Sequence, residues 1–480
     1  MSETVAHQRV HPATIPLRFL KEVPSNLIGL PAIFGIVSDV GLGTVLLVAA
    51  ATGAATFLVN WLKWRNFRYG VGSGDIVIES GLLHRTRRSI PFHRIQDIDI
   101  EQRLGQRLFG LAKVRIETGG SGKDEGVLDS VSLAEADHLR SVLRQVRGGA
   151  SPAAEAVAAA PDALPIIAMP LGRVLLSGLF NFSLLYIAGL FALLQSFEPW
   201  LPFDIYDPGR WMGLIGADVA GRFTPVAIAS VLVLAAALGV VTGVLRILAR
   251  DYGFRLTLEE ESRFRRVRGL FTRSQSVIAR DRIQLALVTD GPVRRLFDGA
   301  DLSFQTLSAG AEGSGRQSVA PFATTGEVEK VLSLAGAYRL PRAGELQMVS
   351  RRHVLRVVLA ELLVPLPLLL IAALFWPAAL LLLPLLVLGA VGAVVSRRFH
   401  LHGLRNGLLL VRKGFWRRRL WIVPAENVQA VAVTRTLLQR WLGLATLHAD
   451  TAGAATFDYP RIVDIRHDEA VALAARLIER

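Results

Sequence analysis

The sequence contains no cysteine among its 480 residues. This absence excludes disulfide bonds, thiolate zinc sites and cysteine nucleophiles, and it leaves the redox compartment open. Acidic residues are also in deficit, since 40 Asp and Glu face 54 Lys and Arg and give a formal charge of +14. This charge balance favours polyanionic partners, either nucleic acid or the anionic surface of a membrane.

Charge is missing from several long stretches of the chain. Hydrophobic residues make up 51% of the sequence and the mean hydropathy is +0.41, compared with roughly 45 to 50% apolar residues in ordinary soluble domains. A bilayer core of about 30 Å requires about 20 apolar residues of helix. The stretches that fit are 26–62, 174–197, 223–245, 354–375 and 378–395.

These stretches predict six membrane helices in three hairpins. Trp376-Pro377 separates the last two stretches and favours a tight turn there. The first stretch is apolar except for Asp39, so it fits two helices that meet near Asp39 or a single span with a re-entrant start. No cleavage-site pattern precedes it, which favours an anchor over a removable signal peptide.

Positive residues flank the outer ends of the hairpins, whereas the connecting loops are mostly acidic. The flanking residues are Arg18, Lys21, Lys63, Arg65, Arg173, Arg246, Arg250, Arg351, Arg352, Arg397 and Arg398. Because Lys and Arg remain on the cytoplasmic side, the N-terminus and the long polar segments are expected there.

One pattern recurs three times in the polar segments. It begins at Gly81, Gly269 and Gly414, reaches an Ile-type residue fourteen positions later, and reaches a second apolar residue twenty-eight positions later. These later positions are Ile95, Ile283 and Val428, then Phe109, Phe297 and Leu442. Alternating strands and a final amphipathic segment predict a curved antiparallel sheet closed by a C-terminal helix.

The pattern resembles the membrane-associated bacterial pleckstrin-homology-like (PH) domain family. The first copy matches at Gly81, Pro91, Ile95 and 107–112, and the third matches at Gly414, Pro424, Val428 and 440–445. The second copy differs at Ala279 and Asp298-Gly299, so whether it keeps the binding surface stays open. The resemblance implies a PH-like fold and a bacterial inner-membrane location, but no agreed activity.

The expected fold class is therefore an α+β membrane protein with six transmembrane helices and three PH-like sheets. The expected boundaries are a tail at 1–22, hairpins at 23–63, 173–249 (outer loop 198–222) and 352–397, PH-like domains at 64–147, 250–336 and 398–480, and linkers at 148–172 and 337–351.

Catalytic and metal-binding motifs are weak. The loop around Gly122-Lys123 lacks the remaining residues of a phosphate loop. His400 and His402 have no third ligand at a suitable interval, which favours surface histidines. Asp97, Asp99 and Glu101 alternate with isoleucines, which predicts a solvent-facing position, and no acid pair recurs in the other copies. The sequence thus predicts neither enzyme activity nor a cofactor or metal.

Basic residues near the repeated turn are the candidates for binding lipid headgroups or a partner. They are Arg85, Arg87, Arg88 and Arg94; Arg265, Arg266 and Arg268; and Arg417, Arg418 and Arg419 with Trp416 and Trp421. Beside an anionic membrane each Lys or Arg contributes roughly 1 kcal/mol. Glu361 is an intramembrane candidate, and its proximity to Arg356 favours a structural role for it.

The sequence favours a non-catalytic membrane scaffold that binds anionic lipids or an unknown protein. Its expected role is in envelope stress resistance, and it is expected to form a homo-oligomer. The alternative is a transporter or lipid-handling protein with a path between the helices, gated by the PH-like domains. A membrane-tethered nucleic-acid binder is the least favoured reading.

Overall fold

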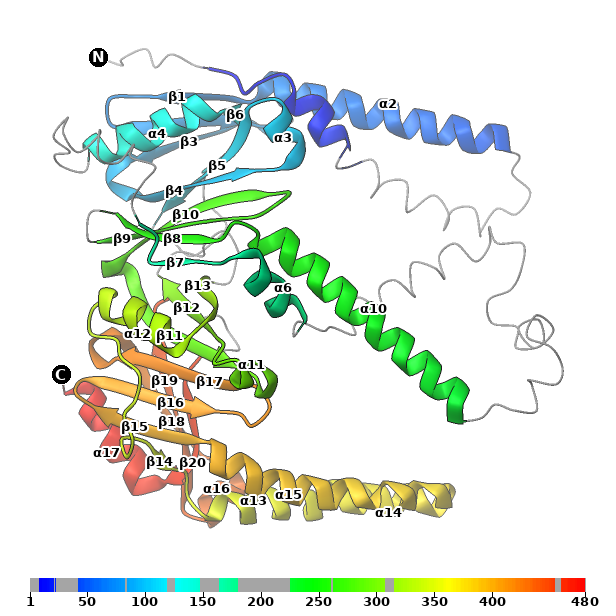
Figure 1. Cartoon of the computed structure of the whole chain (residues 1–480), viewed down its shortest axis with the longest axis vertical. Helices are drawn as coiled ribbons and strands as arrows, with labels where there is room; N and C mark the ends of the chain where they lie inside the picture. Colours follow the sequence, from blue (N-terminus) through cyan, green and yellow to red (C-terminus); the bar gives the residue numbers. More distant parts are fainter. Residues whose placement is uncertain are drawn as a thin grey trace.

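The computed structural model describes residues 8–20, 22, 42–82, 84–118, 126–146, 164–179, 225–259, 262–306, 315–453 and 459–479. Antiparallel sheets form a column, and long helices leave it on one side (Figure 1). Several sequence predictions lie outside these residues, namely a first helix within 23–41, the span 180–197, the outer loop 198–222, the Gly122-Lys123 loop and most of the linker 148–172.

Three successive stretches share one order of elements, and we call them modules 1, 2 and 3. Each has three strands, a 3-10 turn, a fourth strand, a five-residue helix, two more strands and a closing helix. Module 1 contains β1 (Arg68–Val71), β2 (Asp75–Ser80), β3 (Thr86–Pro91), η1 (Phe92–Arg94), β4 (Ile95–Gln102), α3 (Leu104–Leu108), β5 (Leu111–Thr118), β6 (Gly126–Ser132) and α4 (Leu133–Val146).

The other two modules follow the same order. Module 2 contains β8 (Arg255–Glu259), β9 (Arg263–Arg268), β10 (Arg273–Ala279), η3 (Arg280–Arg282), β11 (Ile283–Asp290), α11 (Pro292–Leu296), β12 (Ala300–Thr306), β13 (Arg316–Ala323) and α12 (Thr325–Leu334). Module 3 contains β15 (Leu401–Arg405), β16 (Leu408–Lys413), β17 (Arg418–Pro424), η5 (Ala425–Asn427), β18 (Val428–Thr434), α16 (Leu437–Trp441), β19 (Leu444–Thr451), β20 (Arg461–Arg466) and α17 (His467–Ile478).

The remaining named elements precede the modules in the chain. They are α2 (Leu42–Asn66), β7 (Ile167–Ala168), α6 (Leu171–Leu179), α10 (Pro225–Asp251), β14 (Gln347–Met348), α13 (Arg352–Leu363), α14 (Pro365–Phe375), η4 (Pro377–Leu382) and α15 (Leu383–Phe399).

The repeated glycines occupy a backbone conformation that other residues rarely adopt. Gly81, Gly269 and Gly414 have φ angles of +122°, +112° and +104°. A Cβ on any of them would overlap the carbonyl oxygen of the residue three positions later. The turn between the second and third strands of each module therefore requires glycine.

Replacing Gly269 by alanine should destabilise module 2 by about 2 kcal/mol or more, because the new Cβ meets both an unfavourable φ and a backbone oxygen. Thermal unfolding of the purified chain in detergent measures the change. Gly326→Ala is the control, since a Cβ there has open space around it. An unchanged melting temperature for Gly269→Ala would contradict the strain argument.

The sheets run across module boundaries. In sheet order, β6-β5-β4 of module 1 continues into β10-β9-β8-β7, and β13-β12-β11 of module 2 continues into β17-β16-β15-β14. The expectation of three PH-like curved sheets, each closed by a C-terminal helix, is wrong because two seven-stranded sheets span the modules. Joining β4 to β10 and β11 to β17 satisfies edges that separate modules would leave unpaired.

The shared sheets serve a different hydrophobic core on each face. Along β11, Ala286 and Val288 pack into the core of module 2, whereas Leu285 and Leu287 pack into the core of module 3. Successive side chains of a strand point to opposite faces, so one strand contributes to both cores. We call the junction where strands of two modules pair a seam. A strand at a seam is thus buried on both faces of the sheet.

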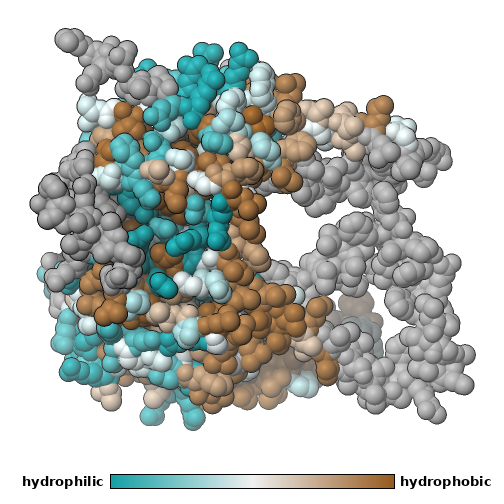
Figure 2. All heavy atoms as spheres, turned by 45° about the horizontal axis from the view of Figure 1, so that its top comes forward, coloured by the Kyte–Doolittle hydropathy of each residue, from teal (hydrophilic) through white to brown (hydrophobic). Residues whose placement is uncertain are grey.

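Two helices among the described residues are long and apolar enough to cross a membrane, Arg352–Phe375 and Pro377–Phe399. The prediction of six membrane helices in three hairpins is wrong as a fold class, because the described chain has this one pair. The pair turns at Trp376 and Pro377, as the sequence predicts. In Figure 2 the densest brown surface lies at the lower centre, where this pair of helices leaves the column.

Candidate functional site

A hollow lined by basic residues lies where α2 enters module 1. Its volume is about 340 Å³ and its lining residues are Arg65, Asn66, Arg68, Glu79, Ser80, Arg85, Thr86 and Arg87. We call it the basic hollow. Arg65 comes from the last turn of α2, Arg68 from β1, and Arg85 and Arg87 from the turn and strand that follow Gly81.

The charge of the basic hollow is unbalanced. Four of its lining residues are arginines, and Glu79 is the one carboxylate among them. The Arg87 Nε lies 3.6 Å from the Glu79 Oε1, and the Arg87 side chain is 68% exposed. Such an exposed pair adds little stability, so its guanidinium can exchange Glu79 for an anionic ligand.

Arg88 and Arg94 are exposed but do not line this hollow. Arg88 is the residue of β3 next to Arg87, so its side chain points to the opposite face of the sheet. Arg94 lies on η1 at the far end of the strand. Of the four candidates in module 1, the structure thus brings Arg85 and Arg87 together.

Two of the three candidate arginines of module 2 are buried. Arg266 is 1% exposed and donates a 2.6 Å hydrogen bond from Nη1 to the Ser318 carbonyl. Arg268 is buried and pairs with buried Asp251 at 3.2 Å. Arg265 pairs with Glu259 at 3.0 Å. Burial therefore removes Arg266 and Arg268 as headgroup ligands, whereas Arg265, with a 30% exposed side chain, stays a candidate.

Asp99 is buried, contrary to its predicted solvent-facing position. Its side chain does point away from Ile98 and Ile100, but module 2 covers that face and leaves Asp99 6% exposed. Burial first, and Glu117 second, raise the pKa of the Asp99 carboxyl to about 7, against the opposing effect of Arg266. This polar cluster lies at the seam between β4 and β10.

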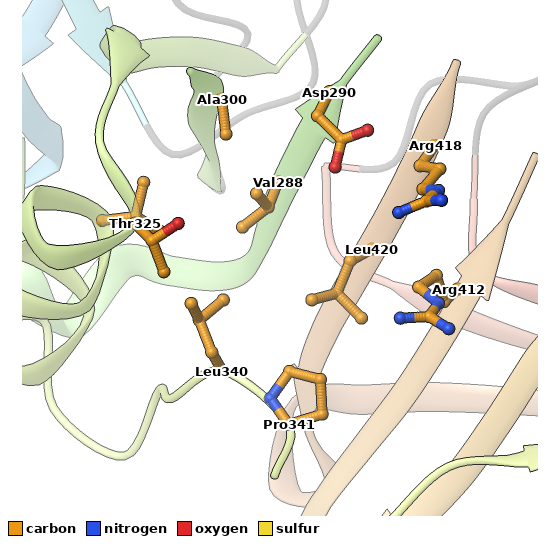
Figure 3. A pocket seen from close by; sticks show the side chains of 10 residues that line it. Val288, Asp290, Ala300, Thr325, Leu340, Pro341, Arg412, Arg418 and Leu420 are labelled. Carbon is orange, nitrogen blue, oxygen red and sulfur yellow. The ribbon is translucent and has the colours of Figure 1, made fainter. Parts of the chain in front are cut away.

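A second hollow lies at the seam between modules 2 and 3, with a volume of about 220 Å³ (Figure 3). Arg412 and Arg418 extend into it from β16 and β17, near Asp290 and Leu420 (Figure 3). The Nε atoms of both arginines are buried without a hydrogen-bond partner among the described residues. Burial lowers the pKa of Arg418, and the adjacent Arg295 lowers it further.

The aromatic candidates of module 3 divide into two groups. Trp416 is exposed at the turn before β17, next to exposed Phe415 and Arg417. Trp421 is 4% exposed and packs in the core of module 3. Its role as an interface aromatic is corrected, since alternation along β17 directs it inward. Arg419 is half-buried on the same strand.

The short helices α3, α11 and α16 expose large apolar side chains, a feature that the sequence reasoning missed. Leu108 and Leu296 are each 80% exposed, and Trp441 is 75% exposed. Phe109 and Phe297, expected as structural positions, are also exposed, whereas Leu442 is buried. The signal was the apolar residue directly after each Arg of the repeated motif.

Glu361 of α13 faces the second helix of the apolar pair. Its carboxylate lies against Gly389 of α15, where a Cβ would overlap it. Arg356 instead pairs with Asp464 of β20, Nε to Oδ2 at 2.6 Å. His353 Nδ1 lies 2.6 Å from the same oxygen, so Asp464 joins the apolar helix α13 to module 3.

His400 and His402 are buried, which corrects their expected surface position. Burial lowers the pKa of His400 to about 3. His402 Nε2 lies 3.0 Å from the Glu469 Oε1. No group of three or more His, Cys, Asp or Glu residues within the described ranges could hold a metal ion.

The family model described as Bacterial PH domain matches residues 25–147, 190–339 and 354–480. The chain belongs to the bacterial PH domain family. A relative from Bacillus subtilis (strain 168), named UPF0699 transmembrane protein YdbT, is 37% identical over 83 residues. That match spans 17% of this chain and 17% of the relative. No solved structure matches this bacterial PH domain chain.

Together the family, this relative and the apolar helix pair indicate association with a membrane. PH domain repeats extend across most of the chain.

Proposed function

We propose that this protein is a non-catalytic membrane scaffold that binds anionic lipid headgroups in the basic hollow of module 1. The observation that carries the proposal is the convergence of Arg65, Arg68, Arg85 and Arg87 on one open site with a single carboxylate. Guanidinium groups bind phosphate oxygens through paired, charge-assisted hydrogen bonds.

The position of the hollow supports a lipid ligand. It lies at the end of α2, on a module whose long helix leaves on the same side as the apolar pair Arg352–Phe375 and Pro377–Phe399 (Figure 1). Positive charge near an anionic surface acts over a Debye length of about 8 Å. Such a site therefore suits headgroups of the cytoplasmic leaflet of a bacterial inner membrane.

The exposed apolar residues of α3, α11 and α16 support the same orientation. Exposed large apolar side chains that gather on one surface mark a contact surface. Trp and Leu side chains suit the interface of a bilayer. In this proposal the three short helices rest in the headgroup region while the arginines bind phosphate. In this proposal the chain crosses the membrane more than once and its modules lie in the cytoplasm.

Removing the charge of the basic hollow should abolish lipid selectivity. The full chain is reconstituted in phosphatidylcholine nanodiscs with a minority of phosphatidylglycerol, and mass spectrometry measures the enrichment of the anionic lipid. Combined Arg68→Gln, Arg85→Gln and Arg87→Gln should lower this enrichment about tenfold or more, since each charge contributes roughly 1 kcal/mol.

The matched control removes three other exposed arginines, Arg405, Arg466 and Arg476, so that the net charge changes equally. Equal loss in both triple variants would show that enrichment follows net charge alone. Unchanged enrichment in the hollow variant would refute the site.

The short helices are tested with thiol-reactive dyes, because the chain has no cysteine. A polarity-sensitive dye on Leu108→Cys or Leu296→Cys should shift to shorter emission wavelength when the protein moves from detergent to anionic nanodiscs. Val471→Cys is the control, since it is exposed on α17, on the side away from the long helices (Figure 1). Equal shifts at all three positions would contradict the orientation.

A further inference from the structure

We infer that copies of this chain join head to tail, with β18 of one copy pairing with β3 of the next. This contact would repeat the seams that already join modules 1 to 2 and 2 to 3. The inference concerns a protein partner and does not depend on lipid binding.

At the first seam, β10 pairs antiparallel with β4, and Arg273 lies opposite Gln102. Arg273 follows the turn glycine Gly269 by four residues, and Gln102 follows Gly81 by twenty-one. These two intervals define the register of the seam.

At the second seam, β17 pairs antiparallel with β11, and Arg418 lies opposite Asp290. Arg418 follows Gly414 by four residues, and Asp290 follows Gly269 by twenty-one. The two seams therefore have the same register, although their side chains differ. Backbone geometry common to the modules sets this pairing.

An arginine on the short helix of one module donates a hydrogen bond to the next module at each seam. Arg107 at the end of α3 donates from Nη1 to the Leu270 carbonyl at 2.8 Å. Arg295 of α11 donates from Nη2 to the Phe415 carbonyl at 3.0 Å. Both acceptors directly follow the turn glycine of the next module.

Module 3 carries the same arginine, and among the described residues no module packs against its fourth strand. Arg440 occupies the equivalent position on α16 and is exposed. Among the described residues, its backbone carbonyl accepts a hydrogen bond from Arg435, whereas its guanidinium donates none. Its equivalent acceptor in a second copy is the carbonyl of Leu82, which follows Gly81 and is exposed.

The two strands that would meet are sheet edges within the described structure. β3 ends the sheet β1-β2-β3, and β18 ends the sheet β18-β19-β20. β18 reads VQAVAVT and has no charged residue or proline, and Ala430 and Ala432 are exposed. An uncharged, exposed edge strand is a ready template for pairing with another chain.

The equivalent strands show what covers such residues. Leu287 of β11 and Asp99 of β4 hold the position of Ala432 and are buried by the module that follows. Within the described residues, no strand pairs with the outer edge of β18 in module 3. A second copy would supply one in the same geometry.

The basic residues of β3 are compatible with this contact. The shared register places Arg85 opposite Arg435, but the Arg435 side chain turns back to the carbonyls of Leu444 and Arg440 at 3.2 Å each. Arg87 is paired with Glu79 of its own module. The remaining positions of β18 carry no positive charge.

The arrangement of the helices also allows repetition. The long helices of all three modules leave the column on one side (Figure 1). A copy added along the column would extend its own helices toward the same side. A heterologous contact of this type yields a ring or an open chain along the membrane.

Disulfide trapping tests the register. Ser89 and Val431 lie opposite each other in the inferred seam, at the positions of Ile422 and Ala286. Ser89→Cys and Val431→Cys are purified separately, reconstituted together in vesicles and oxidised. We expect a covalent dimer from this mixture, because paired strands bring opposite Cβ atoms within about 5.5 Å.

Ala432→Cys is the matched control for Val431→Cys, because the adjacent residue faces the other side of the sheet. An equal dimer yield with Ala432→Cys would overturn the register. Val431→Cys cross-linking mainly to itself would indicate a symmetric pair of β18 strands and would overturn the head-to-tail contact. No cross-link at all, with a monomer by mass photometry, would also overturn it.

Arg440→Ala provides a second measurement that leaves both strands intact. It should weaken self-association of the reconstituted chain about tenfold, whereas Arg405→Ala, an exposed arginine at the β15-β16 turn, should have no effect. Equal association of the two variants would argue against the seam. If the purified chain stays monomeric and cross-links only in native membranes, a different protein occupies β18.

Discussion

Asp464→Asn should detach the apolar helix pair from module 3. The buried carboxylate of Asp464 receives hydrogen bonds from Arg356 Nε at 2.6 Å and Gln439 Nε2 at 2.7 Å, and it lies 2.6 Å from His353 Nδ1. Breaking a buried ion pair by removing one partner costs about 3 to 5 kcal/mol. Hydrogen exchange of α13 and β20 measures the loss, which should appear as local opening.

Asparagine isolates the loss of charge better than alanine does, because Asp464 has a φ of +61°. Asparagine tolerates this conformation, whereas alanine would add backbone strain. Asp468→Asn is the control, since its pair with Arg466 is exposed on both sides. Equal hydrogen exchange in Asp464→Asn and Asp468→Asn would contradict the role of Asp464 in joining α13 to module 3.

Acid should weaken the same joint. The hydrogen bonds to Asp464 hold its pKa below the ordinary value despite burial. A carboxyl with a lowered folded-state pKa stabilises the fold above its unfolded pKa of about 3.9, and this contribution is lost as pH falls through the folded value. Asp464→Asn should therefore remove part of the stability loss below pH 4.

Asp99 should make the seam between modules 1 and 2 more stable at pH 5 than at pH 8. Its pKa is raised to about 7 in the fold. Below its unfolded-state pKa, Asp99 is protonated in both states and does not change the free energy of unfolding. As pH rises further, the raised folded-state pKa lowers the stability until Asp99 ionises in the fold. Between pH 5 and the folded-state pKa of about 7, the cost grows by about two pKa units, or about 3 kcal/mol.

Asp99→Asn should flatten this dependence and raise the melting temperature at pH 8. The groups around it are Glu117 of β5, Arg140 of α4 and Arg266 of β9. Asp137→Asn on the exposed face of α4 is the control for the loss of one charge. A pH profile that is the same for wild type and Asp99→Asn would show that Asp99 is ionised throughout.

The turn glycines illustrate what the sequence could predict. Gly81, Gly269 and Gly414 recur at a fixed interval before two apolar positions, and each adopts positive φ at the turn. The hairpin at Trp376-Pro377 was equally visible, because charge is absent over two helix lengths and proline breaks the helix. Both features depend on residues close together in the chain.

The surroundings of the basic residues could not be predicted from the sequence. Pattern alone could not separate Arg87 at an open hollow from Arg266 in a buried seam. Arg65 and Arg68 join the hollow because α2 packs beside β2 and so brings the end of the helix to this sheet. The buried positions of His402 and Trp421 also depend on distant partners.

The sequence by itself determined the local elements: the turns at glycine, the alternation of strands and the apolar helix pair. Only the tertiary structure decided which sheet edges join, and therefore that Asp99 faces a second module while Ala432 does not. The physical reason is that alternation assigns residues to the two faces of a strand through local geometry. What covers the second face depends on edge pairing between segments far apart in the chain.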